Sequence, residues 1–111
     1  MASDPTFVDF ITDQINHPAG VTAKKMFGDY GIYAGNKIFG LICDNLLFIK
    51  PTEAGRKFIG KPVEAPAYPG AKNSFLIKDK LEDREWLSEL TRLTVAELPE
   101  PKPKKKKAGK R

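Results

Sequence analysis

The stretch KKMFGDYGIYAGNKIFGLICDNLLFIK, residues 24–50, decides the fold of this chain. It is rich in aromatic and branched residues, which favour β-strands. Gly35-Asn36 and Asp44-Asn45 interrupt it, and both pairs tolerate the positive φ that two-residue hairpin turns require. The pattern therefore predicts three strands, residues 24–33, 38–43 and 46–50. Consecutive hairpins make such strands antiparallel.

The segment MFGDYG, residues 26–31, allows two interpretations. A phosphate-binding glycine loop follows a strand and opens a helix, so that helical amides point at the anion. Here the residues after Gly31 form a strand that runs into a hairpin turn, and Asp29 would repel a phosphate. We therefore interpret the two glycines as a bulge or bend within one long strand.

The flanking sequence adds helices and a further strand. Asp4-Pro5 begins a helix over residues 5–16, whose predicted apolar stripe includes Phe7, Phe10 and Ile11. Thr52 caps a short helix over 53–59, residues 74–78 form a strand with 66–68 as a candidate beside it, and a last helix spans 83–98. The predicted order is α-β-β-β-α-β-(β)-α. It describes an α+β two-layer sandwich, with helices on one face of an antiparallel sheet.

Composition divides the chain into two parts. Of its 111 residues, we assign 1–98 to one folded domain and 99–111 to a disordered tail rich in proline and lysine. The net charge of +5 belongs to the tail, because residues 1–101 hold twelve basic and fourteen acidic groups. Seven basic residues lie in the last ten: Lys102, Lys104, Lys105, Lys106, Lys107, Lys110 and Arg111.

Location and chemistry follow from what the sequence contains. A single cysteine, Cys43, favours a reducing compartment, and the first ten residues do not resemble a secretory signal, so we expect a cytoplasmic protein with no membrane contact. The only histidine, His17, suits a capping role at the end of the first helix. Cys43 suits a small core residue better than a nucleophile. We expect no catalytic residues, no metal site and no cofactor.

Two motifs resemble the TfoX N-terminal domain family. They are residues 25–33, KMFGDYGIY, and residues 68–72, YPGAK, and the resemblance spans about residues 5–97. It implies an α+β fold similar to that of secretion chaperones. The name-giving members, TfoX or Sxy, regulate natural competence together with the cyclic-AMP receptor protein. Those regulators have a second, helical domain where this chain has residues 99–111, so the resemblance implies the fold more strongly than the competence role.

The aromatic residues of these motifs suggest a surface for a ligand or partner, because tyrosine suits half-exposed positions and lysines lie nearby. The alternative is a packing motif that holds the bulged strand against the YPGAK loop. The candidate surface comprises Lys25, Met26, Gly28, Tyr30, Gly31, Tyr33, Tyr68, Gly70 and Lys72.

Three functional hypotheses remain. The first is a non-enzymatic regulatory module that contacts a protein partner through its folded domain and nucleic acid, weakly and non-specifically, through the lysine tail. The second is a chaperone-like interaction domain whose tail only aids solubility. The third is a small-ligand binder or enzyme that uses the region of Tyr30, Tyr33 and Tyr68. Sheet edges also make a homodimer a candidate assembly.

Overall fold

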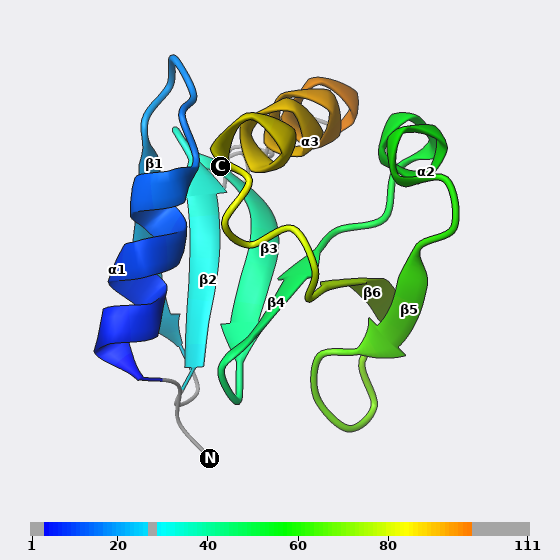
Figure 1. Ribbon diagram of the computed structural model, residues 1–111. Helices are drawn as coiled ribbons and strands as arrows, with labels where there is room; N and C mark the ends of the chain where they lie inside the picture. The colour runs from blue at the N-terminus through cyan, green and yellow to red at the C-terminus, as the bar shows by residue number, and fades with distance from the viewer. Residues whose placement is uncertain (1–3, 27–28, 99–111) are drawn as a thin grey trace, which may run out of the picture.

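A computed structural model describes residues 4–26 and 29–98 of the chain (Figure 1). Three helices and six strands form an α+β fold, which confirms the predicted class. In chain order the elements are α1 (Pro5–Gln14), β1 (Val21–Met26), β2 (Asp29–Ala34), β3 (Lys37–Cys43), β4 (Leu46–Ile49), α2 (Glu53–Ile59), β5 (Val63–Pro66), β6 (Asn73–Ile77) and α3 (Arg84–Glu97).

The strands form one antiparallel sheet in the order β1-β2-β3-β4-β6-β5. The prediction of one long strand over residues 24–33 was wrong in detail. Val21–Met26 is a strand of its own and pairs back on Asp29–Ala34, with Met26 opposite Asp29. The chain therefore reverses direction between these two residues, and four strands precede α2 instead of three. Phe27 and Gly28 lie outside the described residues.

A register shift does occur, but between β2 and β3. Ile32 pairs with Gly40 while Tyr33 pairs with Ile38, which leaves Phe39 as the extra residue. Such a bulge sharpens the local twist of the sheet. The carbonyl of Phe39 accepts a hydrogen bond from the backbone amide of Lys50 at 2.9 Å. The bulge in β3 is therefore fastened to the residue that follows β4.

The caps predicted for the first two helices are present, and Asp83 caps the third. The side chains of Asp4, Thr52 and Asp83 accept hydrogen bonds from the first-turn amides of α1, α2 and α3. Helix α1 ends two residues earlier than predicted, and its buried stripe is Val8, Ile11, Gln14 and Ile15. Phe10, expected in the stripe, is 39% exposed.

Two charged side chains fasten the end of α3. Lys37 donates through Nζ to the carbonyls of Val95 and Leu98, at 3.1 and 2.9 Å. The Glu97 carboxylate accepts from the backbone amides of Glu53 and Ala54 at the start of α2, at 2.9 and 3.0 Å. The last turn of α3 is thus tied both to the sheet and to the neighbouring helix.

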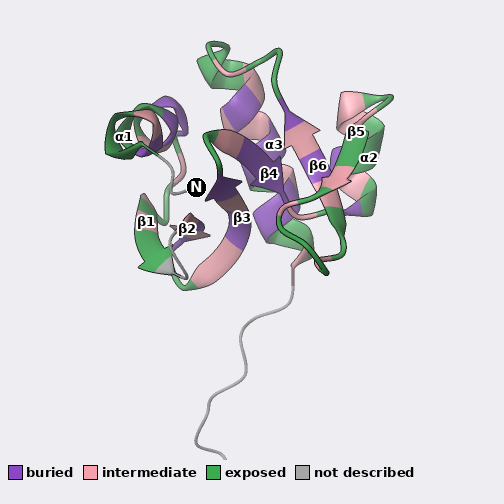
Figure 2. Ribbon diagram, turned by 90° about the horizontal axis from the view of Figure 1, so that it is seen from below, coloured by how far each residue is buried: buried purple, intermediate pink, exposed green. Residues whose placement is uncertain are grey.

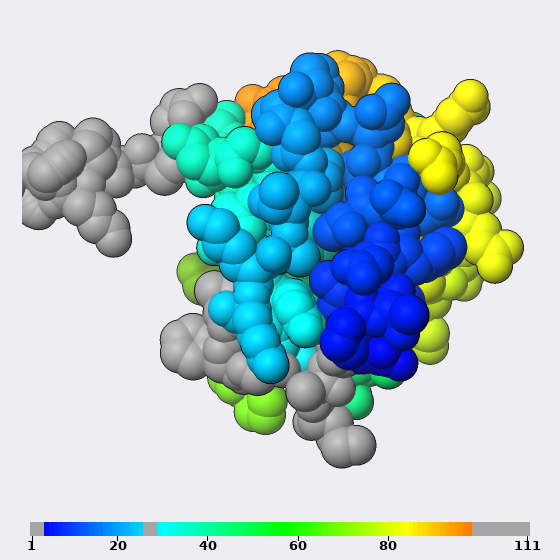
Figure 3. All heavy atoms as spheres, turned by 90° about the vertical axis from the view of Figure 1, so that its left-hand side faces the viewer, coloured from blue at the N-terminus to red at the C-terminus, as the bar shows by residue number. Residues whose placement is uncertain are grey.

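The hydrophobic core lies between the helices and one face of the sheet. Ile11 of α1 and Leu87 and Leu90 of α3 pack with strand residues such as Ile42 and Leu47, all almost fully buried. Figure 2 shows buried positions of β3, β4 and α3 gathered in the interior, and Figure 3 shows α1 lying along β1. The opposite face of the sheet carries none of the three described helices and holds the candidate site.

Candidate functional site on the open face of the sheet

The strand register sorts the side chains between the two faces. One row of directly paired residues crosses all six strands on the side away from the helices, here called the open face. It consists of Lys24, Gly31, Leu41, Phe48, Leu76 and Val63. Side chains two residues apart on a strand share a face, so Tyr33, Cys43 and Lys50 belong to the open face as well. This face is therefore mainly apolar, with lysines at β1 and at the end of β4.

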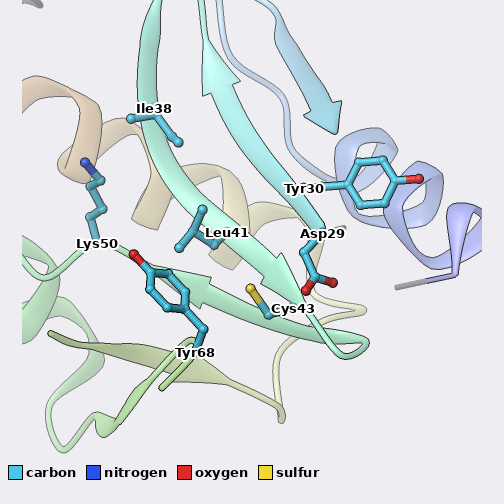
Figure 4. Close-up of a pocket in the computed structure, with 7 residues that line it drawn as sticks. All are labelled: Asp29, Tyr30, Ile38, Leu41, Cys43, Lys50 and Tyr68. Atoms are coloured by element: carbon cyan, nitrogen blue, oxygen red, sulfur yellow. The ribbon is translucent and has the colours of Figure 1, made fainter. Parts of the chain in front are cut away.

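A hollow of about 480 Å³ lies on the open face, over β3 (Figure 4). Its lining residues are Asp29, Tyr30, Ile38, Leu41, Cys43, Lys50 and Tyr68. Ile38, Leu41 and Cys43 follow one another along β3 and form an apolar floor. In Figure 4, Lys50 and Tyr68 border this floor on one side, and Asp29 lies at its Cys43 end.

The surroundings of Cys43 disfavour the thiolate form of its side chain. Burial raises the pKa of the thiol, and the neighbouring carboxylates of Asp29 and Asp44 raise it further. A raised pKa keeps sulfur protonated at neutral pH, and the thiolate is the reactive form. Cys43 is buried, as predicted for a small core residue, and it contributes to the apolar floor.

The two charged groups of the hollow differ in their partners. The Asp29 carboxylate accepts a hydrogen bond from the backbone amide of Asp44 at 3.3 Å. Lys50 is half-buried, and its ammonium makes no hydrogen bond or ion pair with any residue that the structure describes. The carboxylate at one end of the hollow is therefore hydrogen-bonded, whereas the ammonium at the other end has no partner among the described residues.

The tyrosines predicted to act together lie on different faces. Tyr33 is on the open face, where the Lys24 ammonium sits 5.1 Å from its ring centroid. Tyr30 is half-buried against the helix-side core, and in Figure 4 its ring points away from Tyr68. The two positions are three residues apart in one strand, so the strand alternation itself separates them.

The remaining predicted residues are spread more widely. Lys25 pairs with Tyr30 on the helix side, and its side chain is exposed. Gly31 is on the open face, and Met26 ends β1. Tyr68 is 56% exposed beside the hollow, and Gly70 and Lys72 lie exposed in the loop between β5 and β6. Gly28 and the seven basic tail residues lie outside the described residues.

His17 has a local structural role. Its Nδ1 accepts a hydrogen bond from the backbone amide of Ala19 at 3.0 Å, and its carbonyl accepts one from Gly20 at 2.9 Å. These bonds stabilise the turn after α1. His17 does not cap the helix as predicted, because α1 ends at Gln14 and Ile15 is its C-cap. Across residues 4–26 and 29–98, no group of three or more histidine, cysteine, aspartate or glutamate residues could hold a metal ion.

Five residues of the hollow were not part of the predicted surface: Asp29, Ile38, Leu41, Cys43 and Lys50. Alternation along the strands could have placed two of them. Leu41 lies two residues from Cys43, and Lys50 lies two residues from Phe48, so each pair shares a face. Ile38 could not be placed in this way, because the bulge at Phe39 breaks the alternation in β3.

Comparison with known proteins identifies the family. The family model of the TfoX N-terminal domain matches residues 13–98, which is most of the chain and nearly all of the described fold. The chain belongs to the TfoX N-terminal domain family. This confirms the resemblance inferred from the KMFGDYGIY and YPGAK motifs.

One relative matches this TfoX N-terminal domain protein over almost its full length. It is a protein of Spirochaeta aurantia described as "Uncharacterized 12.7 kDa protein in trpE 5'region", 40% identical over 107 residues. The match covers 96% of this chain and 93% of the relative. None of the described helices of the TfoX N-terminal domain is both long and apolar enough to cross a bilayer.

Proposed function

We propose that this protein is a non-enzymatic regulatory module of the cytoplasm. Its folded domain contacts a protein partner, and its basic C-terminal residues contact nucleic acid weakly and without sequence preference. The observation that carries the proposal is the separation of charge: residues 1–101 are net acidic by two groups, whereas the last ten residues hold seven basic groups. Membership of a family named after competence regulators supports a regulatory role.

The charge separation predicts how binding depends on salt. Each neutralised phosphate of duplex DNA releases condensed counterions, with a log–log slope of about −0.9 per contact. Seven contacts therefore give a slope of about −6. Because the folded part is slightly acidic, it adds little to this attraction, and affinity should fall steeply as salt is raised.

The test compares the intact chain with a full-length variant in which all seven tail cations are replaced by glutamine. Binding to a random-sequence duplex is measured by fluorescence anisotropy at several salt concentrations. We expect the intact chain to bind with the steep slope and the variant to lose binding. Equal binding by both would place the contact on the folded domain, and no binding by either would exclude nucleic acid as a partner.

The partner contact has a separate test. The open face exposes Val63 at 59% and Tyr68 at 56%, and we propose that the partner contacts this face. A protein captured from the native cell should form a complex with the purified chain, and Val63→Lys should weaken that complex. Lys57→Glu, on the exposed side of α2, is the matched control and should leave it unchanged. An effect of Lys57→Glu alone would move the contact away from the open face.

The same exposed residues favour a second candidate, a chaperone-like interaction domain whose tail only aids solubility. The two candidates differ in the intact chain: the first expects it to bind nucleic acid, whereas the second expects no nucleic-acid binding by the intact chain or by the glutamine variant. Both expect the variant to keep its protein partner.

A further inference from the structure

The hollow over β3 has the dimensions and the surface of a small-molecule site. Sites for small ligands measure about 300–1,000 Å³ and are mostly apolar, with a few polar groups that fix orientation. The hollow, at about 480 Å³, offers Ile38, Leu41 and the Tyr68 ring as apolar surface. Its polar groups are few and lie at its ends (Figure 4).

The backbone of Lys50, the residue that carries the cation of the hollow, is hydrogen-bonded to β3. The Lys50 amide donates to the carbonyl of Phe39 at 2.9 Å, so the residue is attached to the bulge of β3. Its side chain extends from the end of β4 in the direction of Ile38 (Figure 4). Lys50 is half-buried, and no described residue supplies an anion to its ammonium. A ligand carboxylate at this position would make a charge-assisted hydrogen bond with it. The arrangement therefore favours a ligand with a negative group at the Lys50 end.

The other end of the hollow disfavours a second negative group. Asp29 lies there, beyond Leu41 and Cys43, and its carboxylate is held by the Asp44 amide. Like charges at close range repel, more strongly where water is excluded. The Cys43 thiol adds an uncharged, apolar surface at this end because its raised pKa keeps it protonated.

We propose that the hollow binds an amphiphilic monocarboxylate, with its carboxylate at the Lys50 ammonium and its apolar body along Ile38, Leu41 and Cys43. The ligand class is an aliphatic or aromatic acid with one negative charge. This site is independent of the basic tail, and binding at it does not require nucleic acid. It gives a regulatory module a means to respond to a small organic acid.

Three probes of similar length separate the contributions of charge and apolar surface. Octanoate carries one carboxylate, suberate carries a carboxylate at each end, and octylammonium carries a cation instead. Binding is measured by calorimetry and by amide shifts in NMR spectra of the full chain at neutral pH. We expect octanoate to shift the amides of Leu41, Cys43 and Lys50. Suberate should bind about tenfold more weakly because its second carboxylate faces Asp29, and octylammonium should not bind.

Substitutions assign the charges to residues. Lys50→Met keeps the apolar stem and should weaken octanoate binding about tenfold, the usual effect of losing a charge-assisted hydrogen bond. Lys50→Arg should retain most of the affinity. Lys57→Met, on α2, removes an exposed cation that does not line the hollow and serves as the control. Asp29→Asn should reduce the difference in binding affinity between octanoate and suberate.

Several outcomes would overturn the proposal. They are octylammonium binding as tightly as octanoate, amide shifts confined to residues outside the hollow, and equal losses in Lys50→Met and Lys57→Met. Absence of octanoate binding up to its solubility limit would also overturn it. Because the tail variant described above should bind octanoate normally, failure of this proposal is distinguishable from failure of the nucleic-acid proposal.

Discussion

The two faces of the sheet are built from neighbouring residues of the same strands, yet they differ in how far their side chains are buried. On the helix side, Ala23, Ile32, Gly40, Ile49, Phe75 and Glu64 form a paired row across six strands. The adjacent row on the open face runs from Lys24 to Val63. Ile32, Ile49 and Phe75 are fully buried, whereas the open row is buried mainly at its centre, at Gly31 and Phe48. The comparison shows that the helix side buries the core, whereas the open face leaves several apolar side chains partly exposed.

The largest expected effect comes from truncating adjacent residues of β3 that lie on opposite faces. Ile42 is fully buried, so Ile42→Ala should lower the free energy of unfolding by about 3 kcal/mol through lost burial and a residual cavity. Leu41 is only partly buried, so Leu41→Ala should cost about 1 kcal/mol. Urea denaturation of both variants measures the difference, and equal losses would contradict the division of roles between the faces.

A second effect tests how closely the helix-side row is packed. A Cβ atom on Gly40 would lie 2.6 Å from the carbonyl oxygen of Phe48 and 3.2 Å from Ile49 Cδ1. The first contact is with backbone and cannot be relieved by a rotamer change. Gly40→Ala should therefore lower the free energy of unfolding by about 2 kcal/mol. Unchanged stability in thermal and urea melts would show that β3 and β4 can separate without cost.

The third prediction is a substitution that should raise the stability of the fold. The Thr91 hydroxyl of α3 is buried and has no hydrogen-bond partner among the described residues. Thr91→Val should therefore raise the free energy of unfolding by about 1 kcal/mol, the cost of an unpaired buried hydroxyl. Thr94→Val is the matched control, because the buried Thr94 hydroxyl donates to the carbonyl of Leu90 at 2.8 Å. A gain in the control equal to that of Thr91→Val would contradict this explanation.

The smallest effect is a pH dependence at the junction of α2 and α3. Hydrogen bonds from the Ala54 and Glu53 amides lower the pKa of Glu97 in the folded protein. Stability from this group is therefore complete above its unfolded pKa and is lost as pH falls through the folded pKa. Glu97→Gln should show a weaker loss of stability than the wild type between neutral pH and about pH 3. Parallel pH profiles of the two proteins would exclude this contribution.

Most of the fold could be predicted because its signals are local. Asp4 and Thr52 cap the first two helices where expected, since each precedes an apolar helical pattern. Asp44 and Asn45 both have positive φ, 53° and 60°, as the predicted hairpin turn requires. The β1–β2 hairpin was missed because residues 24–33 read as one continuous β-rich stretch. Only the pairing of Met26 with Asp29 shows that the chain reverses there.

The candidate site was harder to predict because it depends on contacts between distant segments. Tyr68 is brought beside β3 by the loop that follows β5, and no local pattern encodes that approach. Tyr30 and Tyr33 could have been separated by counting residues, because an odd spacing in a strand places side chains on opposite faces. The unengaged charge of Lys50 becomes visible only when all its described neighbours are known.

The bonds from Lys37 to the carbonyls of Val95 and Leu98 have a mechanical consequence. Lys37 is the first residue of β3, and Ile38, the next one, lines the hollow. Through these bonds, a force applied to the chain beyond Leu98 acts on the first residue of β3 as well as on the last turn of α3. Tethering the C-terminus to a large polymer would therefore apply force to Lys37, the residue next to Ile38 at the edge of the hollow.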